Sequence, residues 1–254
     1  MKLFSWRFFR VWQRNRDVFI RLWPAEVPGM IIEPVFILLA MGIGMGAYIG
    51  MVEGQRYIDY VAPGIIAGYS MFSASFECTY GSFVRMEYQK TYDAIIATPL
   101  SVEDVTAGEI FWGATRACLT GTVMLAIAAA FQLIHSPWSL LIPFISFLEG
   151  MMFASIALFY TSIVPYIYSY NYYFSLFITP MFFFSGVFFP LSSFPPVVQT
   201  LSWIAPLTPV VLLNRAVVSG TFRPESLWAL LAIFIVTAFF FSLSLFTMRR
   251  RLTR

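Results

Sequence analysis

The sequence predicts an all-α integral membrane protein with six transmembrane helices, an N-terminal amphipathic interfacial helix and outer re-entrant helices between spans five and six. Hydrophobic residues make up 59% of the 254 residues, charged residues only 11%, and the mean hydropathy is +0.76. Soluble proteins of this length carry about a quarter charged residues. Uncharged runs approach the roughly 20 residues that cross a bilayer as one helix. Water is therefore not the main solvent of this chain.

Residues 1–25 are predicted to form the amphipathic helix in the membrane interface. One helical face carries Arg7, Arg10, Arg14, Asp17 and Arg21, which recur every three or four residues. The opposite face carries Phe4, Phe8, Val11, Trp12, Phe19 and Leu22. Basic and aromatic faces together are typical of a helix that lies among anionic head groups. The arginines also argue against a cleavable signal peptide, so internal spans are expected to direct insertion.

Residues 26–251 are predicted to form one transmembrane domain. Its spans are expected at residues 29–51, 61–83, 106–132, 138–164, 171–189 and 226–248, each long enough for a tilted helix. Twelve Lys and Arg residues outside the spans fall on the side of the two termini, and only Arg56, Arg215 and Arg223 fall on the other. Because cytoplasmic loops carry the excess of basic residues, both termini are expected in the cytoplasm.

Residues 190–220 have an unusual composition for a loop between two spans. The segment is rich in apolar residues, yet it contains Pro190, Pro195, Pro196, Pro206 and Pro209. Proline removes a backbone donor and interrupts a helix, so one continuous helix is excluded. Short re-entrant helices that dip into the outer leaflet satisfy both observations, provided that protein covers their backbone.

Five ionisable residues lie within the predicted spans, where an unpaired charge is costly. Glu33 and Glu109 are near cytoplasmic ends and are expected to reach the interface. Glu77 and Arg116 lie at similar depths in antiparallel spans, which favours a structural ion pair. The alternative is that Arg116 binds a substrate head group. Glu149 lies near the middle of the fourth span and is expected to face a polar interior or to carry a proton.

Three glycines of the first span, Gly42, Gly46 and Gly50, recur at a spacing of four residues. Small residues at this spacing let a second helix approach the backbone closely. Packing within the chain and contact with a second copy both fit this helix-packing pattern.

The sequence contains no motif for ATP or for a metal ion. No segment matches a Gly-rich phosphate loop ending in Gly-Lys-Ser or Gly-Lys-Thr, so the chain is not expected to bind ATP by itself. His135 is the only histidine, and Cys78 and Cys118 lie inside spans as ordinary buried thiols. We therefore expect no metal site, no cofactor in this chain and no enzymatic activity.

Residues 84–105 form the main loop on the predicted cytoplasmic side. A short amphipathic helix fits the stretch after Tyr88, and it is expected to end before Pro99 because the residue preceding a proline disfavours helical angles. Ser101 is expected to cap the third span, with Asp104 near the positive end of that helix. A short helix that projects between two spans is suited to docking in a groove of another protein.

Two stretches of the sequence resemble the type 2 ABC-transporter permeases. The first is YDAIIATPL at residues 92–100, followed by Gly108, Glu109 and the third span. The second comprises FSGVFFPL at residues 184–191, Pro195 and Pro196, PLTP at residues 206–209, and Asn214, Arg215 and Ala216 with Gly220. The likeness covers nearly the whole chain and is greatest to permeases that export lipo-chitooligosaccharide nodulation factors. Drug-resistance permeases of the family share much of it, although many carry His at the position of Pro209.

This resemblance implies a permease of the bacterial inner membrane that pairs with a second copy of itself and with two copies of a separate ATPase, which would hold ATP and Mg. The surface for coupling to the ATPase would comprise Gln89, Lys90, Tyr92, Asp93, Ile96, Thr98, Pro99 and Leu100. The outer gate would comprise Phe188, Phe189, Pro190, Pro206 and Arg215. The implied substrate is an amphipathic lipid-linked saccharide, a lipooligosaccharide or a similar lipophile, and drug efflux is the alternative within the family.

Two other functional classes fit the sequence less well. A proton-coupled secondary transporter would use Glu77 and Glu149 as proton carriers, but paired broken-helix halves are lacking. An intramembrane enzyme would need a nucleophile and a base at membrane depth. Membrane lipids are expected as partners, whereas nucleic acid is not, because no basic patch lies on a soluble domain. Dependence of transport on ATP separates the permease from the carrier.

Overall fold

The computed structural model describes residues 6–222 and 224–253, and this part of the chain is almost entirely helical. Its elements are, in chain order, α1 (Phe8–Leu39), η1 (Ala40–Met45), α2 (Gly46–Ile49), β1 (Met51–Val52), β2 (Gln55–Arg56), α3 (Tyr57–Phe76), η2 (Glu77–Gly81), η3 (Val84–Tyr88), α4 (Thr91–Ile96), α5 (Val102–Ala130), η4 (Pro137–Leu141), α6 (Ile142–Ile163), η5 (Ile167–Ser169), α7 (Tyr170–Tyr172), η6 (Tyr173–Ile178), α8 (Thr179–Phe184), η7 (Leu191–Ser193), α9 (Pro196–Ile204), α10 (Leu207–Ser219) and α11 (Pro224–Leu252). The two short strands form a hairpin in which Met51 pairs with Arg56. The predicted all-α class is confirmed.

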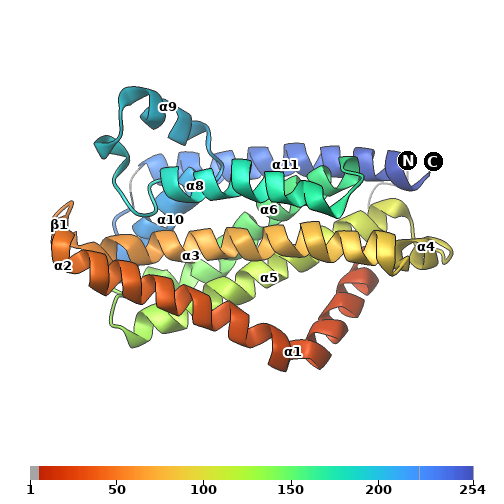
Figure 1. Cartoon of the computed structure of the whole chain (residues 1–254), viewed down its shortest axis with the longest axis horizontal. Coiled ribbons are helices and arrows are strands. Elements are labelled where there is room, and N and C mark those ends of the chain that lie inside the picture. The colour runs from red at the N-terminus through yellow and green to blue at the C-terminus, as the bar shows by residue number, and fades with distance from the viewer. Residues whose placement is uncertain (1–5, 223, 254) are drawn as a thin grey trace.

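The long helices run side by side along one axis of the molecule (Figure 1). Among the residues described, four helices are long and apolar enough to cross a membrane: Phe8–Ile49, Val102–Ala130, Pro137–Ile163 and Pro224–Leu252. The pair Pro196–Ile204 and Leu207–Ser219 passes the same test together but bends by 87° at its break. The chain is therefore a multi-pass membrane protein with four or five candidate spans.

The predicted spans at residues 61–83 and 171–189 are not among these candidates. The first corresponds to α3, η2 and η3, which follow one another from Tyr57 to Tyr88. The second corresponds to the run from η5 to α8, which ends at Phe184, several residues before the predicted end. The six-span count therefore stays a prediction, as do the re-entrant helices.

The central helix α5 packs against α1, α3 and α6. Small residues set the spacing between α5 and α6. A Cβ atom at Gly150 of α6 would lie 2.6 Å from the Cβ atom of Ala117 and 2.7 Å from the Cα atom of Ala114. There is no room for a side chain at that position, so these helices approach as closely as small-residue membrane interfaces allow.

The predicted interfacial helix and the first span are joined in one helix, α1. The predicted boundary at residues 25–26 thus lies inside α1, and residues 1–5 lie outside the described part of the chain. Pro24, Pro28 and Pro34 lie within α1, which is strongly bent (Figure 1). Proline removes an intrahelical hydrogen bond and is a common cause of helix kinks. The N-terminal part of α1 therefore takes a different direction from the part that follows the bundle.

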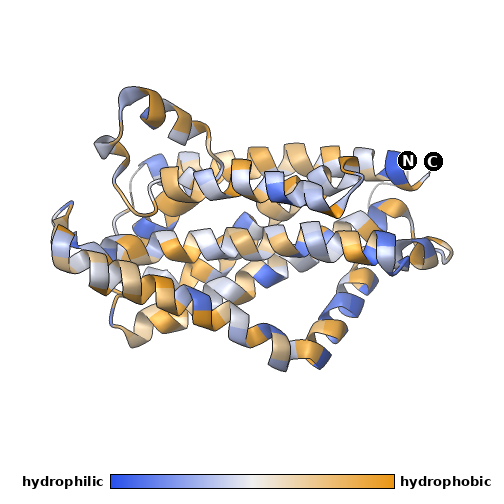
Figure 2. Ribbon diagram, viewed as in Figure 1, coloured by the Kyte–Doolittle hydropathy of each residue, from blue (hydrophilic) through white to orange (hydrophobic). Residues whose placement is uncertain are grey.

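Both ends of the described chain lie at the same end of the bundle as α4, whereas β1, α2 and α9 lie at the opposite end (Figure 1). Figure 2 shows hydrophobic residues along the whole length of the long helices and hydrophilic residues gathered near α4. Among the basic residues counted in the sequence, Lys2, Arg223 and Arg254 lie outside the described residues. The described ends of the chain and the loop at residues 84–105 thus lie at one end of the bundle, and their cytoplasmic location stays a prediction.

Candidate functional site

The loop at residues 84–105 presents α4 at one end of the bundle (Figure 1). Gln89, Lys90, Asp93, Thr98 and Pro99 are exposed, and Ile96 and Leu100 are half-buried. Tyr92 differs, because its side chain is only 1% exposed. Most of the predicted coupling residues therefore form an accessible surface, whereas Tyr92 anchors α4 to the bundle.

A hydrogen-bonded turn and a capping box separate α4 from α5. The Thr98 hydroxyl donates to the carbonyl oxygen of Ile95 (2.6 Å), and no helix continues through Pro99. The side chain of Ser101 accepts from the backbone N–H of Asp104, whose carboxylate accepts from the backbone N–H of Ser101. This reciprocal pair satisfies two free donors at the start of α5. The predicted cap at Ser101 is confirmed.

Basic residues from both ends of the chain contact this loop. Arg7 donates to the carbonyl oxygen of Pro99 (2.6 Å), and Arg251 of α11 donates to Glu87 of η3 (2.8 Å). Burial alone would raise the pKa of Glu87, but the hydrogen bond and charge of Arg251, with Lys90, hold this pKa below its ordinary value. Because of these contacts, a displacement of α4 would also displace α1 and α11, in addition to α5.

A cluster of ion pairs lies inside the bundle beside this loop. Arg85 of η3 binds Glu77 of η2 (2.8 Å) and Glu109 of α5, while Arg116 of α5 binds Glu26 of α1 (2.6 Å). The Nε atom of Arg116 also lies 3.5 Å from a Glu77 carboxylate oxygen. We call these five residues the ion-pair cluster. It joins α1, the η2–η3 segment and α5.

The sequence interpretation found part of this cluster and missed part. Glu77 and Arg116 were placed together, but Glu26 and Arg85, their nearer partners, were not named. Glu109 does not reach the interface as predicted, because it is completely buried and accepts hydrogen bonds from Asn15 (3.0 Å) and Ser82 (2.9 Å). One signal was available: Glu77 and Arg85 are eight residues apart, close to two helical turns, which favours one side of the same helix.

One face of the N-terminal part of α1 packs on α5, and its position in the membrane interface stays a prediction. The Trp12 indole N–H donates to the Thr115 hydroxyl (2.8 Å), and Phe8 packs on Phe111 with ring centroids 4.8 Å apart. Gly108 makes this crossing close, since a Cβ atom there would lie 2.8 Å from the carbonyl oxygen of Phe8. The N-terminal helix is thus part of the packed bundle.

A cavity of about 390 Å³ lies between α1, the α3–η3 run and α5. Its lining comprises Arg14, Asn15, Val18, Phe19, Leu22, Glu26, Glu77, Tyr80, Gly81, Val84, Arg85, Gln89, Trp112 and Arg116. One side of this cavity is formed by four members of the ion-pair cluster, and another by apolar side chains of α1. The four are Glu26, Glu77, Arg85 and Arg116. We call it the inner cavity.

Glu149 of α6 is completely buried in the bundle. Among the residues that the structure describes, neither of its carboxylate oxygens has a hydrogen-bond partner. Its neighbour Gly150 is in tight contact with α5. The polar interior expected around Glu149 is therefore not formed by side chains of the described residues.

The three glycines of the first span have three different environments. A Cβ atom at Gly42 would lie 2.5 Å from Ile58, so this glycine permits close packing within the chain. A Cβ atom at Gly46 would make ordinary contact with Tyr57 at 3.9 Å. Gly50 has a φ of +70°, a backbone conformation that favours glycine, at the entry to the hairpin. The spacing of four thus reflects packing at Gly42 and a turn at Gly50.

The predicted outer-gate residues lie at the end of the bundle opposite α4. Phe188 is buried, Phe189 is 40% exposed, and Pro190 and Pro206 precede η7 and α10 respectively. The Arg215 guanidinium stacks 3.7 Å above the centre of the Tyr60 ring and donates to the carbonyl oxygen of Gly186. Arg215 of α10 therefore fixes the chain after α8 against α3.

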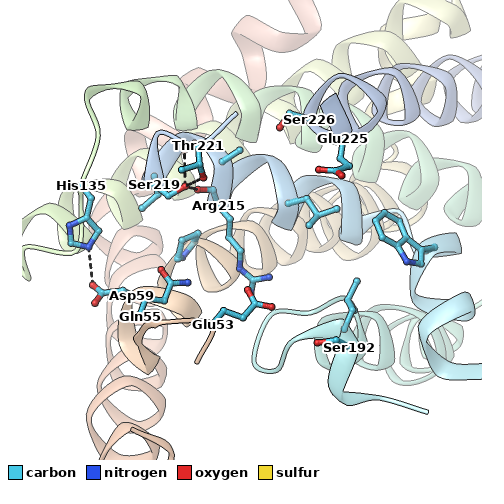
Figure 3. A pocket seen from close by; sticks show the side chains of 16 residues that line it. Glu53, Gln55, Asp59, His135, Ser192, Arg215, Ser219, Thr221, Glu225 and Ser226 are labelled. Atoms are coloured by element: carbon cyan, nitrogen blue, oxygen red, sulfur yellow. Dashed lines mark hydrogen bonds and ion pairs between the residues drawn. The ribbon is translucent and has the colours of Figure 1, made fainter. Parts of the chain in front are cut away.

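A second cavity, of about 450 Å³, opens beside Arg215 (Figure 3). Its lining includes three carboxylates, Glu53, Asp59 and Glu225, together with His135 and Trp203. His135 lies 3.1 Å from Asp59, and Figure 3 shows Arg215 and Glu53 pointing toward one another. Among the residues described, no group of three His, Cys, Asp or Glu side chains is arranged to hold a metal ion.

Comparison with known proteins matches residues 2–218 to the family described as ABC-2 type transporter. Nodulation protein J of Sinorhizobium fredii is 36% identical over 251 residues, which cover 97% of this chain and 94% of that protein. Nodulation protein J of Rhizobium leguminosarum bv. trifolii is 37% identical over 261 residues, covering 98% and 95%. The inner membrane transport permease YadH of Escherichia coli K12 is 24% identical over 207 residues, covering 78% and 77%. This chain belongs to the ABC-2 type transporter family.

Proposed function

We propose that this chain is the membrane-spanning permease of an ABC exporter that moves a lipid-linked saccharide, a lipooligosaccharide or a similar amphipathic lipophile out of the cytoplasm or the inner leaflet. The proposal rests mainly on the family match. The matched residues, 2–218, include both the loop that carries α4 and most of the outer segment. The relatives named nodulation protein J, together with the resemblance to nodulation-factor export permeases, support the substrate class.

ATP hydrolysis is assigned to a separate ATPase subunit, which holds ATP and Mg. Two copies of that subunit dock on two copies of this chain, each through the exposed residues of the 89–100 segment. Arg7 contacts this segment at Pro99, Arg251 contacts Glu87 just before it, and α5 begins just after it. These connections support the assignment, since they link a docked partner to three long helices. The chain itself acts as a transport subunit and not as an enzyme.

The chain crosses the bacterial inner membrane six times, with both termini in the cytoplasm. The two additional spans, at residues 61–83 and 171–189, correspond to the helical runs from Tyr57 to Tyr88 and from Ile167 to Phe184. The bent pair α9 and α10 forms the re-entrant outer gate, with Phe188 and Arg215 at its base. The basic residues around α4 support this orientation.

Drug or lipophile efflux is the alternative within the family, because the sequence also resembles drug-resistance permeases of that family. A proton-coupled carrier is the alternative from another class. The observation that favours it is the buried Glu149, which lacks a hydrogen-bond partner among the described residues. ATP dependence separates the carrier from both permease functions.

The test is to purify the tagged protein from its own membranes, identify the subunits that accompany it and measure ATP hydrolysis in nanodiscs. We expect a stoichiometric ATPase and altered hydrolysis in Asp93→Ala, because Asp93 is exposed on α4. Glu225→Ala, an exposed carboxylate at the opposite end, is the matched control. A well-folded preparation without an ATPase and without hydrolysis would place the proton-coupled carrier first.

A further inference from the structure

One carboxylate of α1, Glu33, is exposed on the outside of the bundle. Its Oε1 atom accepts a hydrogen bond from the Tyr69 hydroxyl of α3 (3.3 Å). Its Oε2 atom has no partner among the residues that the structure describes. Phe36, about one turn along α1, is 68% exposed. The described chain therefore leaves this face of α1 open.

The contacts of α1 with α3 place Glu33 deep in the membrane. Within the predicted span at residues 61–83, Tyr69 is eight residues from the outer end and fourteen from the inner end, or roughly 12 Å and 21 Å. A second contact agrees, because Glu26 and Glu77, which share one arginine, lie seven and eight residues from this pair on their respective helices. Both distances exceed the reach of a glutamate side chain. This depth differs from the expectation that Glu33 reaches the interface.

A carboxylate at this depth is not expected to face lipid. Placing its charge near the centre of a bilayer is costly, and one hydrogen bond from Tyr69 does not replace its hydration. Ionisable residues at membrane depth instead face protein or a water-filled cavity, and they mark the route of a substrate. Because the described residues supply no cation and no second donor to Glu33, its further partner comes from outside this chain.

An aromatic row leads from the inner cavity to this carboxylate. Its members recur every three or four residues on one side of the α3–η2 run and are Tyr69, Phe72, Phe76 and Tyr80. Phe174 of η6 stacks on both Phe72 and Phe76. Phe76 is 49% exposed, and Tyr80 lines the inner cavity. The row thus forms an accessible apolar surface that ends beside Glu33.

We propose, resting on the proposed function, that Glu33 and Tyr69 bind the saccharide part of the exported molecule midway through the membrane. The free oxygen of Glu33 accepts hydrogen bonds from sugar hydroxyl or amide groups, and the aromatic row contacts the apolar faces of the sugar rings and the acyl chain. Hydrogen bonds to a carboxylate are among the stronger ones in proteins. Glu33 thereby favours lipophiles that carry hydrogen-bond donors over those that lack them.

The first test measures ATP hydrolysis by the full-length protein with its ATPase in nanodiscs. The probe is chitotetraose with one N-palmitoyl group, and methyl palmitate has the same chain without the sugar. We expect only the probe to stimulate hydrolysis, and Glu33→Gln to raise its half-maximal concentration about tenfold, as for the loss of a charge-assisted hydrogen bond. Glu225→Gln makes the same change at an exposed carboxylate outside the predicted spans and should have no effect.

The outcomes separate this site from the proposed function. Stimulation by the probe at the same half-maximal concentration in Glu33→Gln and the unchanged protein would overturn the site and leave the exporter in place. Equal stimulation by methyl palmitate would also overturn it. A preparation without an ATPase would refute the exporter instead, and the site would then be tested by labelling.

Cysteine labelling needs neither a substrate nor an ATPase. In a chain with Cys78 and Cys118 replaced by alanine, we expect Glu33→Cys to react with a charged, water-soluble thiosulfonate, because a thiol must ionise to react and does so in water but not in lipid. Ile235→Cys is the control, since Ile235 is 60% exposed near the middle of α11, and it should stay unreactive. If Glu33→Cys were as unreactive as Ile235→Cys both with and without ATP, lipid or a second copy would cover this position, and the proposal would fail.

Discussion

At the scale of single residues, the ion-pair cluster explains how the chain keeps carboxylates inside a membrane protein. Glu109 is completely buried, yet Asn15, Ser82 and Arg85 all donate to it. A buried carboxylate is tolerated when an opposite charge and hydrogen bonds replace its hydration. Asn15 belongs to α1, whereas Ser82 and Arg85 belong to the α3–η3 run, so the carboxylate of Glu109 in α5 also holds these segments together.

Glu109→Gln is therefore expected to destabilise the protein by about 3–5 kcal/mol, because it leaves the buried Arg85 without one of its counter-charges. Glu109→Gln combined with Arg85→Gln should do less harm than the sum of the single changes, since no uncompensated charge remains. Unfolding with a chemical denaturant in detergent measures both effects. The control is Glu103→Gln, whose partner Arg249 is 56% exposed, and we expect less than about 1 kcal/mol there. Equal losses in Glu103→Gln and Glu109→Gln would contradict the buried role of Glu109.

Some contacts of the ion-pair cluster could be predicted from the sequence, and others could not. Depth along antiparallel helices was enough to bring Glu77 and Arg116 together. Glu26 lies before the predicted first span and was not considered, and the path of α1 across the bundle brings it to Arg116. Arg85 was assigned to a loop, whereas the helix continues to Tyr88 through two π-helical turns. Such turns are not encoded in a hydrophobic pattern, so the eight-residue spacing of Glu77 and Arg85 was the one sequence signal that could have brought them together.

At the scale of elements, the crossing of α1 over α5 depends on Gly108. A Cβ atom at this position would lie 2.6 Å from the Cβ atom of Val11 and 2.8 Å from the carbonyl oxygen of Phe8. Because one of these atoms belongs to the backbone, the helices must move apart to admit a side chain. Gly108 preceded Glu109 in the stretch that carried the family resemblance, but the sequence did not indicate which helix it contacts.

Gly108→Ala is expected to destabilise the protein by about 1–3 kcal/mol through overpacking, and to loosen the N-terminal part of α1 first. Gly29→Ala is the matched control on α1 itself, since no atom lies within 4 Å of its Cβ position. Alanine there should be neutral or stabilising by up to about 1 kcal/mol, because glycine is a poor helix former. Unfolding in denaturant and limited proteolysis of residues 8–23 measure the two responses. A protected N-terminal segment in Gly108→Ala would show that the crossing does not require glycine.

Element boundaries were predictable where short-range chemistry decides them. Proline at position 99 and the Ser101–Asp104 box separate α4 from α5 as the sequence indicated. The junction between the interfacial helix and the first span was not predictable, because the break in polarity near residue 25 does not coincide with a break in the backbone of α1. The polarity of the residues along a helix reflects the medium around each part of it, whereas the continuity of the helix depends on its backbone hydrogen bonds.

At the scale of the whole molecule, two runs of helix decide the topology. The run from Ile167 to Phe184 comprises 18 residues, which at 1.5 Å per residue span about 27 Å, close to the roughly 30 Å of a hydrocarbon core. The run from Tyr57 to Tyr88 is longer and carries Glu77 and Arg85 in its second half. If both runs cross, residues 84–105 and both termini share one side of the membrane, and the outer segment lies on the other.

Cysteine labelling tests each crossing separately. In a chain with Cys78 and Cys118 replaced by alanine, we expect Met51→Cys and Ser192→Cys to react with a membrane-impermeant maleimide in intact spheroplasts, because both positions are exposed at the predicted outer end. Gln89→Cys and Tyr168→Cys are exposed at the other end and should react only after permeabilisation. Each pair of sites flanks one run, so Met51 and Gln89 report on residues 57–88, and Tyr168 and Ser192 report on residues 167–184. If Ser192→Cys reacted only after permeabilisation while Met51→Cys reacted at once, the run that ends at Phe184 would not cross, and the outer gate would lie on the cytoplasmic side.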